Sequence, residues 1–414
     1  MGILEKKKIY LDYAGATPID KNVAEKMALY EHDFFANPSA IYKDGVKVRS
    51  VIDEARNTIA KLINAHSDEI IFTGSGTESD ALAILGVIRE WKIKNKNKIS
   101  HIVTTRIEHP AVLENCRLLE NAGEVEVTYV GVDSNGIINL EEFEESLKEN
   151  TVLVSVMYAN NEIGTIQPIE EIAKIIRHFK KSRAKQEVHS PEDLYPLFHT
   201  DACQAMNYLF TENIEKLGVD LMSFNSSKIY GPKGIGVLYK KRSIDLSPLY
   251  GGGGQEFGLH SGTENISLIA GIAEAFSITN KIKQKESERL TKIRDYGIEK
   301  LISLAKTSGY KIILNGDKEK RLPNNINISI FGISSELLVI ELDAKGIELS
   351  AKSACKSGDS NDSYVINAIR KICKRDGKEE GSLRISLGRD TKKSDIDKFI
   401  SILIKILEKY NTWK

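Results

Sequence analysis

The chain has 414 residues, of which 41% are hydrophobic and 28% are charged, and 58 Lys and Arg residues balance 58 Asp and Glu residues. This composition is typical of a globular protein and excludes a disordered or collagen-like chain, while the length favours two domains over one core. A net charge of zero gives no electrostatic footprint for nucleic acid or an acidic membrane, and no apolar run approaches the roughly 20 residues of a membrane span.

Helical and strand patterns alternate from about residue 45 to residue 240. The predicted elements are, in chain order, a helix at 46–63, a strand at 69–73, a helix at 77–91, a strand at 101–105, a helix at 110–121, a strand at 125–130, a helix at 140–147, a strand at 151–157, a helix at 168–180 and strands near 196–200, 220–224 and 235–239. Short apolar strands separated by amphipathic helices predict βαβ units on a mainly parallel sheet, which binds ligands at the carboxyl ends of its strands.

The remaining segments are less regular. Residues 181–195 are polar and aperiodic, which predicts a surface insertion, and the glycine cluster at 251–254 predicts a domain junction. A long charged helix is predicted over about 280–304, followed by a strand near 325–331. The closing helix is predicted to begin at Ser394 with Asp397 completing a capping box. Its predicted buried stripe consists of Ile396, Phe399, Ile400, Leu403 and Leu407.

Lys228 and Asp201 each follow a predicted strand and suggest a cofactor. Lys228 lies in NSSKIYGPKGIG before a glycine-rich turn and could form a Schiff base, although most lysines of this chain are surface charges. Asp201 lies in HTDACQA, where its carboxylate could pair with a cationic ring nitrogen or could simply cap a helix. Pyridoxal phosphate needs such a carboxylate, because its protonated ring acts as an electron sink.

The segment FTGSGTESD (72–80) reads as a strand, a glycine-bearing turn and a helix start. Free backbone N–H groups at Gly76 and Thr77, together with the helix dipole, would bind an anion. The spacing fits neither the GxGxxG dinucleotide fingerprint nor a GxxxxGK[ST] phosphate loop. The segment therefore predicts a phosphate site of another kind.

Taken in order, these motifs resemble those of the cysteine desulfurases, pyridoxal-phosphate enzymes of aminotransferase class V. The resemblance rests on ten motifs: YLDYAGATP, FANPSA, FTGSGTESD, EHPAV, NNEIG, HTDACQ, SSKIYGPKGIG, SGTEN, SACKSG and RISLGR. It implies the α/β fold of the type I aminotransferases. A large domain at 19–254 would carry a mainly parallel sheet, and 1–18 with 255–414 would form a smaller α+β domain that carries the cysteine segment.

The resemblance also implies a role for each motif. The catalytic residues would be Lys228 as the Schiff-base lysine, His109 as the ring-stacking proton carrier and Cys355 as the nucleophile. Pyridoxal 5'-phosphate would be bound by Gly76, Thr77, His109, Asn161, Asp201, Gln204, Ser227, Lys228 and, from a second subunit, Thr263. Arg384, with Asn161, would bind the substrate carboxylate through its guanidinium fork, and no metal ligand is implied. From the residues alone, His109 could instead cap a helix and Arg384 could form a structural ion pair.

The positions of the cysteines agree with this resemblance. Cys355 lies among Ser, Lys and Gly, and Lys352 and Lys356 should favour its thiolate. The other cysteines are predicted to be packed residues: Cys116, Cys203 and Cys373. No CxxC pair occurs, which predicts a reducing, cytoplasmic compartment.

Several positions depart from the usual family pattern. They are Asn225 and Ser227 in place of Ser-x-His, Tyr42 near an expected His, His260 in place of Arg, and Ala16 in place of Thr. None of these departures removes a reacting group. They concern phosphate binding and subunit contacts.

The implied reaction converts L-cysteine to L-alanine and leaves a persulfide on Cys355. The sulfur would pass to an acceptor protein of iron–sulfur cluster assembly or tRNA thiolation. The eight mostly polar residues between Cys355 and Tyr364 are similar to the long loop of the iron–sulfur-assembly branch. A cytoplasmic homodimer without membrane or direct nucleic-acid contacts is expected. The alternatives are a selenocysteine lyase, a tRNA-dependent cysteine-forming enzyme or another related lyase, and a non-catalytic assembly platform.

Overall fold

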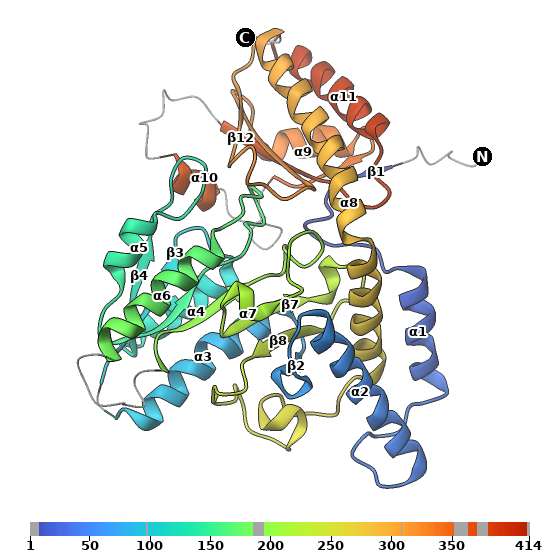
Figure 1. The fold of residues 1–414 in the computed structure, drawn as a ribbon. Helices are drawn as coiled ribbons and strands as arrows, with labels where there is room; N and C mark the ends of the chain where they lie inside the picture. Colours follow the sequence, from blue (N-terminus) through green and yellow to red (C-terminus); the bar gives the residue numbers. More distant parts are fainter. Residues whose placement is uncertain are drawn as a thin grey trace.

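The computed structural model describes residues 8–96, 98–184, 194–307, 309–351, 363–370 and 380–411. A seven-stranded sheet organises the larger part of the molecule (Figure 1). Its strands, in spatial order, are β2 (Ile70–Thr73), β8 (Gly236–Lys240), β7 (Leu221–Asn225), β6 (Leu197–Asp201), β5 (Thr151–Ser155), β3 (Ser100–Thr105) and β4 (Val125–Val130). Strand β8 is antiparallel to both its neighbours, and all other pairings are parallel. The predicted α/β class with a mainly parallel sheet is confirmed.

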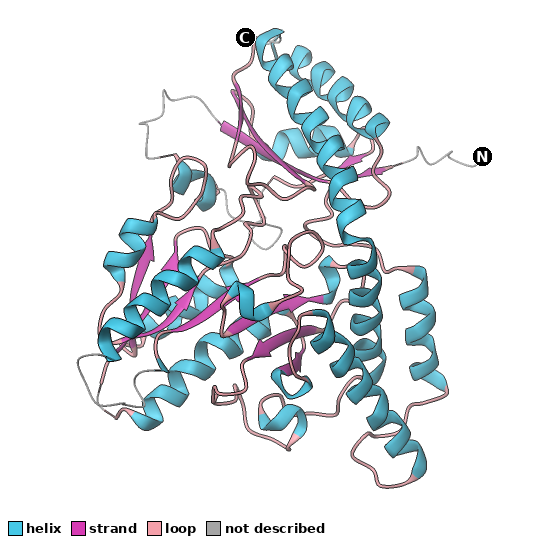
Figure 2. Ribbon diagram, in the orientation of Figure 1, coloured by secondary structure: helices cyan, strands magenta, loops and turns pink. Residues whose placement is uncertain are grey.

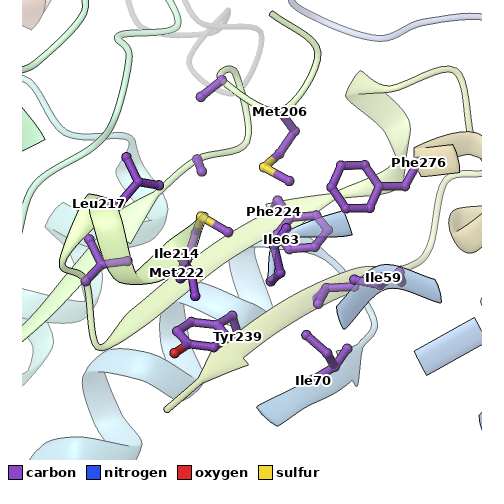
Figure 3. Packing of buried hydrophobic residues seen from close by; sticks show 14 of the residues in the cluster. Ile59, Ile63, Ile70, Met206, Ile214, Leu217, Met222, Phe224, Tyr239 and Phe276 are labelled. Carbon is purple, nitrogen blue, oxygen red and sulfur yellow. The ribbon is translucent and has the colours of Figure 1, made fainter. Parts of the chain in front are cut away.

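Helices cover both faces of this sheet (Figure 2). The helices are α1 (Lys21–His32), α2 (Lys43–Leu62), α3 (Gly76–Lys94), α4 (Pro110–Asn121), α5 (Leu140–Ser146), α6 (Ile169–Ala184), α7 (Ile214–Leu217) and α8 (Ile266–Thr307). One face buries Phe224 and Met222 of β7 against Ile59 of α2 and Phe276 of α8 (Figure 3). The other face buries Ile71 against α3 and α4. Burial of each such side chain stabilises the fold by about 1.5–3 kcal/mol.

A second, smaller group of elements stands at the far end of α8 (Figure 1). It contains the antiparallel sheet β12 (Glu380–Ser386), β10 (Asn325–Phe331) and β9 (Ile312–Leu314), and the parallel pair β1 (Ile9–Tyr10) and β11 (Ile347–Glu348). Its helices are α9 (Ser335–Asp343) and α11 (Lys393–Asn411). The short helix α10 (Tyr364–Ile369) packs instead against the larger part, where Ile366 shares a buried cluster with Ile107 and Ile163. The 42-residue helix α8 belongs to both parts, since Ile272 packs in the first core and Leu301 in the second. The domain boundaries predicted from the sequence stay a prediction.

Most predicted elements coincide with observed ones. The helix at 110–121 and the strands at 125–130 and 325–331 are confirmed to the residue. The long helix begins at Ile266 and not near 280. Its first turns are apolar on nearly all sides and lack a charged face, so the sequence pattern does not indicate a helix there. Residues 185–193 of the predicted insertion lie outside the described residues.

The last helix begins one residue before its predicted start, and the predicted capping box of Ser394 and Asp397 is wrong. Helix α11 begins at Lys393, and the Asp395 carboxylate accepts the Lys392 amide at 2.8 Å. Asp397 instead forms an ion pair with Lys300 at 3.0 Å. The predicted stripe of five apolar residues is buried, as expected. Among the described residues, no helix is both long and apolar enough to cross a membrane.

Candidate active site

A cavity of ≈ 120 Å³ lies at the carboxyl edge of the seven-stranded sheet. It is lined by Ala14, Gly15, Gly76, Thr77, Asp80, His109, Met157, Ala159, Asn161, Asp201, Cys203, Gln204, Asn225, Lys228 and Arg384. Most of these residues follow strands β2, β3, β5, β6 and β7 directly, because parallel strands end at one edge of a sheet. Eight of the residues predicted from the sequence meet here: Gly76, Thr77, His109, Asn161, Asp201, Gln204, Lys228 and Arg384.

Gly76 opens helix α3 at the end of β2. Ser75 is the N-cap, and its hydroxyl accepts the Glu78 amide at 3.1 Å, so the first amides of the helix face the cavity end of the sheet. A Cβ atom on Gly76 would lie 2.7 Å from the Cys203 sulfur, which explains the glycine. The predicted strand, turn and helix start are confirmed, and free amides at a helix N-terminus can bind an anion.

Lys228 and Asp201 approach the cavity from neighbouring strands. The Lys228 ammonium donates hydrogen bonds to the carbonyl of Ala14 at 2.7 Å and to that of Gly15. The Asp201 carboxylate ends β6 and accepts the Cys203 amide at 2.8 Å. Gln204 donates its amide to the same Ala14 carbonyl at 3.0 Å. The N-terminal segment is therefore held against the sheet edge by the predicted cofactor residues.

His109 is both the helix cap and a cavity residue. Its Nδ1 accepts the Ala111 amide at 3.1 Å at the start of α4. Burial, with Lys228 and Arg384 nearby, lowers the pKa of His109, although Asp201 opposes this shift. The neutral ring therefore carries its proton on Nε2. The two interpretations left open by the sequence, a cap and a functional residue, are compatible.

Arg384 reaches the cavity from the smaller sheet. The side chain is 2% exposed and donates to the Asn161 carbonyl at 3.0 Å and to the Asp12 carboxylate at 2.8 Å. The structural ion pair, which was the alternative interpretation of Arg384, is therefore present, with Asp12 as its partner. It leaves the Nε atom of Arg384 buried without a hydrogen-bond partner.

The cavity suits an anionic ligand that has several acceptors and donors. Among the described residues, three buried side-chain atoms of the lining have no hydrogen-bond partner: Asp80 Oδ1, Asn161 Oδ1 and Arg384 Nε. Unsatisfied buried polar atoms are costly, so they indicate a bound group. Asp80, His109 and Asp201 are close enough to share a metal ion, but the cations Lys228 and Arg384 line the same cavity and favour a phosphate or carboxylate ligand.

Three predicted residues are not among the lining. The Ser227 hydroxyl donates to the Asn225 amide oxygen at 3.3 Å, and Asn225 itself lines the cavity. Thr263 is exposed on the segment before α8. Cys355, with Lys352 and Lys356, lies outside the described residues, as does Cys373. The roles assigned to these residues stay predictions.

Two titratable residues of the lining are not among the site residues predicted from the sequence. Cys203 was expected to be packed in the interior, but it lines the cavity, where burial and nearby carboxylates raise the pKa of its thiol. Asp80 lay inside a motif that was recognised for its glycine turn, and its position four residues after Gly76 was the available signal. Cys116, in contrast, is fully buried as predicted.

Comparison with known proteins identifies the family. An aminotransferase class-V family model matches residues 9–399. Cysteine desulfurase IscS of Dictyoglomus turgidum is 42% identical over 410 residues, which cover 98% of this chain and 96% of that protein. Cysteine desulfurase IscS 1 of Archaeoglobus fulgidus is 38% identical over 401 residues, covering 97% of each chain.

Solved structures agree. A NifS-like protein matches with a TM-score of 0.82 and 31% identity, covering 98% of this chain and 100% of its own. SspA, solved in complex with cysteine, matches with a TM-score of 0.74 and 32% identity, covering 92% and 99%. The motif resemblance is thereby confirmed: the chain belongs to the aminotransferase class-V family, among its cysteine desulfurases.

Proposed function

We propose that the chain converts L-cysteine to L-alanine and transfers the sulfur to Cys355 as a persulfide. The observation that carries the proposal is the convergence of Lys228, Asp201 and Arg384 on one cavity from two separate sheets. The relatives named as cysteine desulfurases support this reaction over the lyase and non-catalytic alternatives. The iron–sulfur-assembly branch is supported by the IscS name that these relatives share.

The cavity residues fit pyridoxal 5'-phosphate. The amides of Gly76 and Thr77 would hold the phosphate, Lys228 would hold the aldehyde carbon, and Asp201 would face the ring nitrogen. The bound cofactor supplies an electron sink for the α-carbon of the substrate. Asn161 and Gln204 offer amide groups to its remaining polar atoms.

Arg384 is the residue that would bind the substrate. Its guanidinium would take the carboxylate of cysteine, since the Nε atom has no partner within the described residues. His109 carries a proton on Nε2 and lies beside Lys228 in the lining, so it can hold or move a proton at the substrate. The Cys355 thiolate then attacks the substrate sulfur: a sulfur–sulfur bond forms, the carbon–sulfur bond breaks with its electron pair left on carbon, and that carbon takes a proton to give alanine.

Both ends of the segment that contains Cys355 are tied to the cavity. Ser350 exchanges backbone hydrogen bonds with Arg384 at 2.7 and 3.4 Å. Ser363 donates its hydroxyl to Glu162, the neighbour of Asn161, at 2.5 Å, and Tyr364 donates to the Glu108 carbonyl at 2.6 Å. Cys355 is the fifth residue after Ser350, which gives a reach of up to about 17 Å. The chain length therefore permits Cys355 to reach the cavity.

A comparison of Cys355→Ser with wild type tests the proposal. The variant should bind the cofactor and change its visible absorption on addition of L-cysteine, because Lys228, Asp201 and Arg384 are intact. It should form no persulfide and almost no alanine. Cys116→Ser, at a packed position, is the matched control and should retain both products. Alanine release by Cys355→Ser at the wild-type rate would contradict the proposal and favour a lyase.

We further propose a cytoplasmic homodimer in which Thr263 contacts the cofactor phosphate of the second subunit. Thr263 is exposed and outside the cavity of its own chain. Large apolar side chains are exposed six residues before it, at Phe257 (58%), and on the segment between α1 and α2, at Phe35 (77%) and Ile41 (97%). Mixed dimers of Lys228→Ala and Thr263→Ala subunits would contain one intact site and should regain activity. A monomer that binds the cofactor tightly would contradict this arrangement.

A further inference from the structure

Asp80 is a buried carboxyl group that the proposed reaction does not use. It lies on the first turns of α3, is 1% exposed and lines the cavity. Its Oδ1 atom has no hydrogen-bond partner. An ionised carboxylate is strongly unfavourable in such a place, so the group is neutral unless a cation compensates it.

The nearest acid is Asp201. One oxygen of Asp80, one oxygen of Asp201 and one ring nitrogen of His109 all lie within 4.8 Å of one another. Two buried carboxylates at such a separation repel each other, and the pair retains one proton. Asp201 accepts the Cys203 amide at 2.8 Å, whereas Oδ1 of Asp80 has no hydrogen-bond partner among the described residues and the Asp80 side chain is hydrogen-bonded only to Ser223 there. The proton of the pair therefore belongs on Asp80.

The other groups that face Asp80 do not compensate its charge. Nε2 of His199, on β6, lies 3.6 Å from Asp80 Oδ1, beyond hydrogen-bond distance. Both ring nitrogens of His199 are bonded to hydroxyls, of Ser155 and Ser223, each at 2.9 Å. Burial lowers the pKa of His199 to about 4, so this ring is neutral near pH 7.

Glu108, which precedes α4, is also fully buried. Burial raises its pKa to about 8, so it too is predominantly neutral near pH 7. Burial first, and then the charge of Asp201, raise the pKa of Asp80 well above its ordinary value, while Ser223 opposes this shift. These directions agree with the hydrogen-bond geometry.

We propose that Asp80 is a positioning residue that carries the single proton of an Asp80–Asp201 pair, so that the pair presents one negative charge to the cavity. The inference rests on the proposed role of Asp201 opposite the ring nitrogen. When Asp201 is removed, Asp80 loses a repulsive neighbour and can ionise in its place.

Infrared spectroscopy of the cofactor-free protein at pH 7 tests the protonation directly. Asp80→Asn should remove part of the carboxylic-acid carbonyl band, and Glu108→Gln should remove a separate part. Asp53→Asn, at an exposed position on α2, should leave the band unchanged. An unchanged band in Asp80→Asn would overturn the proposal, whatever the role of Asp201.

Cofactor dissociation constants then test whether Asp80 acts through Asp201. Asp80→Asn keeps a neutral group and should weaken binding by no more than roughly threefold, whereas in an Asp201→Asn background it should weaken binding by a further tenfold or more. The same small factor in both backgrounds would overturn the proposal. If Asp201→Asn alone leaves binding unchanged, the proposed function fails at Asp201, and the infrared result still reports the proton on Asp80.

Discussion

The two sheets of this protein contribute to the site in different ways. The seven-stranded sheet provides its residues at strand ends, so Asp201 and Lys228 face one edge as a direct result of parallel topology. The smaller sheet provides Arg384 from the middle of β12, where its side chain crosses to Asn161 and Asp12. The first contribution is set by strand connectivity, and the second depends on how the two parts of the molecule pack.

The two sheets also differ in the chemistry of the groups that they hold. The edge of the large sheet holds the groups that fit a cofactor, and the smaller sheet holds the group that fits a substrate carboxylate. The segment that contains Cys355 is bonded to the smaller sheet at Ser350 and to the larger part at Ser363 and Tyr364. Variants on the two sides should therefore fail in different assays. Four experiments test this separation.

Removal of Lys228 should have the largest effect. Lys228→Ala should abolish alanine formation, because no other amine of the lining can hold the cofactor carbon. Turnover is measured with L-cysteine and alanine quantification. Lys233→Ala, at an exposed position in the same glycine-rich turn, should behave as wild type. Normal turnover by Lys228→Ala would show that the large sheet does not provide the lysine that holds the cofactor.

Arg384→Lys should affect the substrate and leave the cofactor in place. A lysine keeps the charge but loses the planar fork, which should raise KM for cysteine about 10–100-fold. The matched probe is cysteamine, which lacks the carboxylate, and its effect on the cofactor spectrum should be the same in variant and wild type. An equal loss for both ligands would show that Arg384 acts structurally.

The anchor at Tyr364 should give a smaller effect. Tyr364→Phe removes one hydrogen bond, to the Glu108 carbonyl, worth about 1 kcal/mol, and should slow persulfide formation without changing cofactor affinity. Tyr158→Phe, which removes a comparable exposed bond to the Phe210 carbonyl, is the control. Loss of cofactor from Tyr364→Phe would show that this anchor supports the cofactor site and does more than hold the Cys355 segment.

The smallest effect is expected at His260, which forms an ion pair with Glu78 at 3.0 Å next to the predicted phosphate site. The hydrogen bond to Glu78 raises the pKa of His260, and the same bond lowers the pKa of Glu78. The pair therefore stabilises the fold below the ordinary histidine value of 6.5, and this stabilisation is lost as pH rises through the higher folded value.

His260→Gln should accordingly lower the melting temperature near pH 6 and have no effect near pH 9. The loss should stay below about 1 kcal/mol, because both side chains are partly exposed. Tyr250→Phe, which removes a neutral contact to Glu78 at 3.3 Å, should show no such pH dependence. A pH-independent loss in His260→Gln would mean that the contact is not an ion pair.

Much of the large sheet could be predicted from the sequence, because its strands are short apolar runs between amphipathic helices. The sequence predicted a capping box at Ser394 that does not form, because Asp397 pairs with Lys300 of α8, which is far away in the sequence. The early start of α8 was missed for a related reason: residues buried on all sides show no period. Cys203 was misjudged because a cysteine inside a motif looks the same whether it faces a core or a cavity.

The sequence by itself determined the order of the strands along the chain, the helix start at Gly76 and most of the residues that meet in the cavity. Those features depend on local pattern and on motif chemistry, which neighbouring residues encode. Only the tertiary structure decided that Arg384 lies beside Asn161, that Asp80 faces Asp201 and that both ends of the Cys355 segment are tied to the cavity. These contacts join residues that are far apart in the chain, and their formation depends on packing energies that no local pattern records.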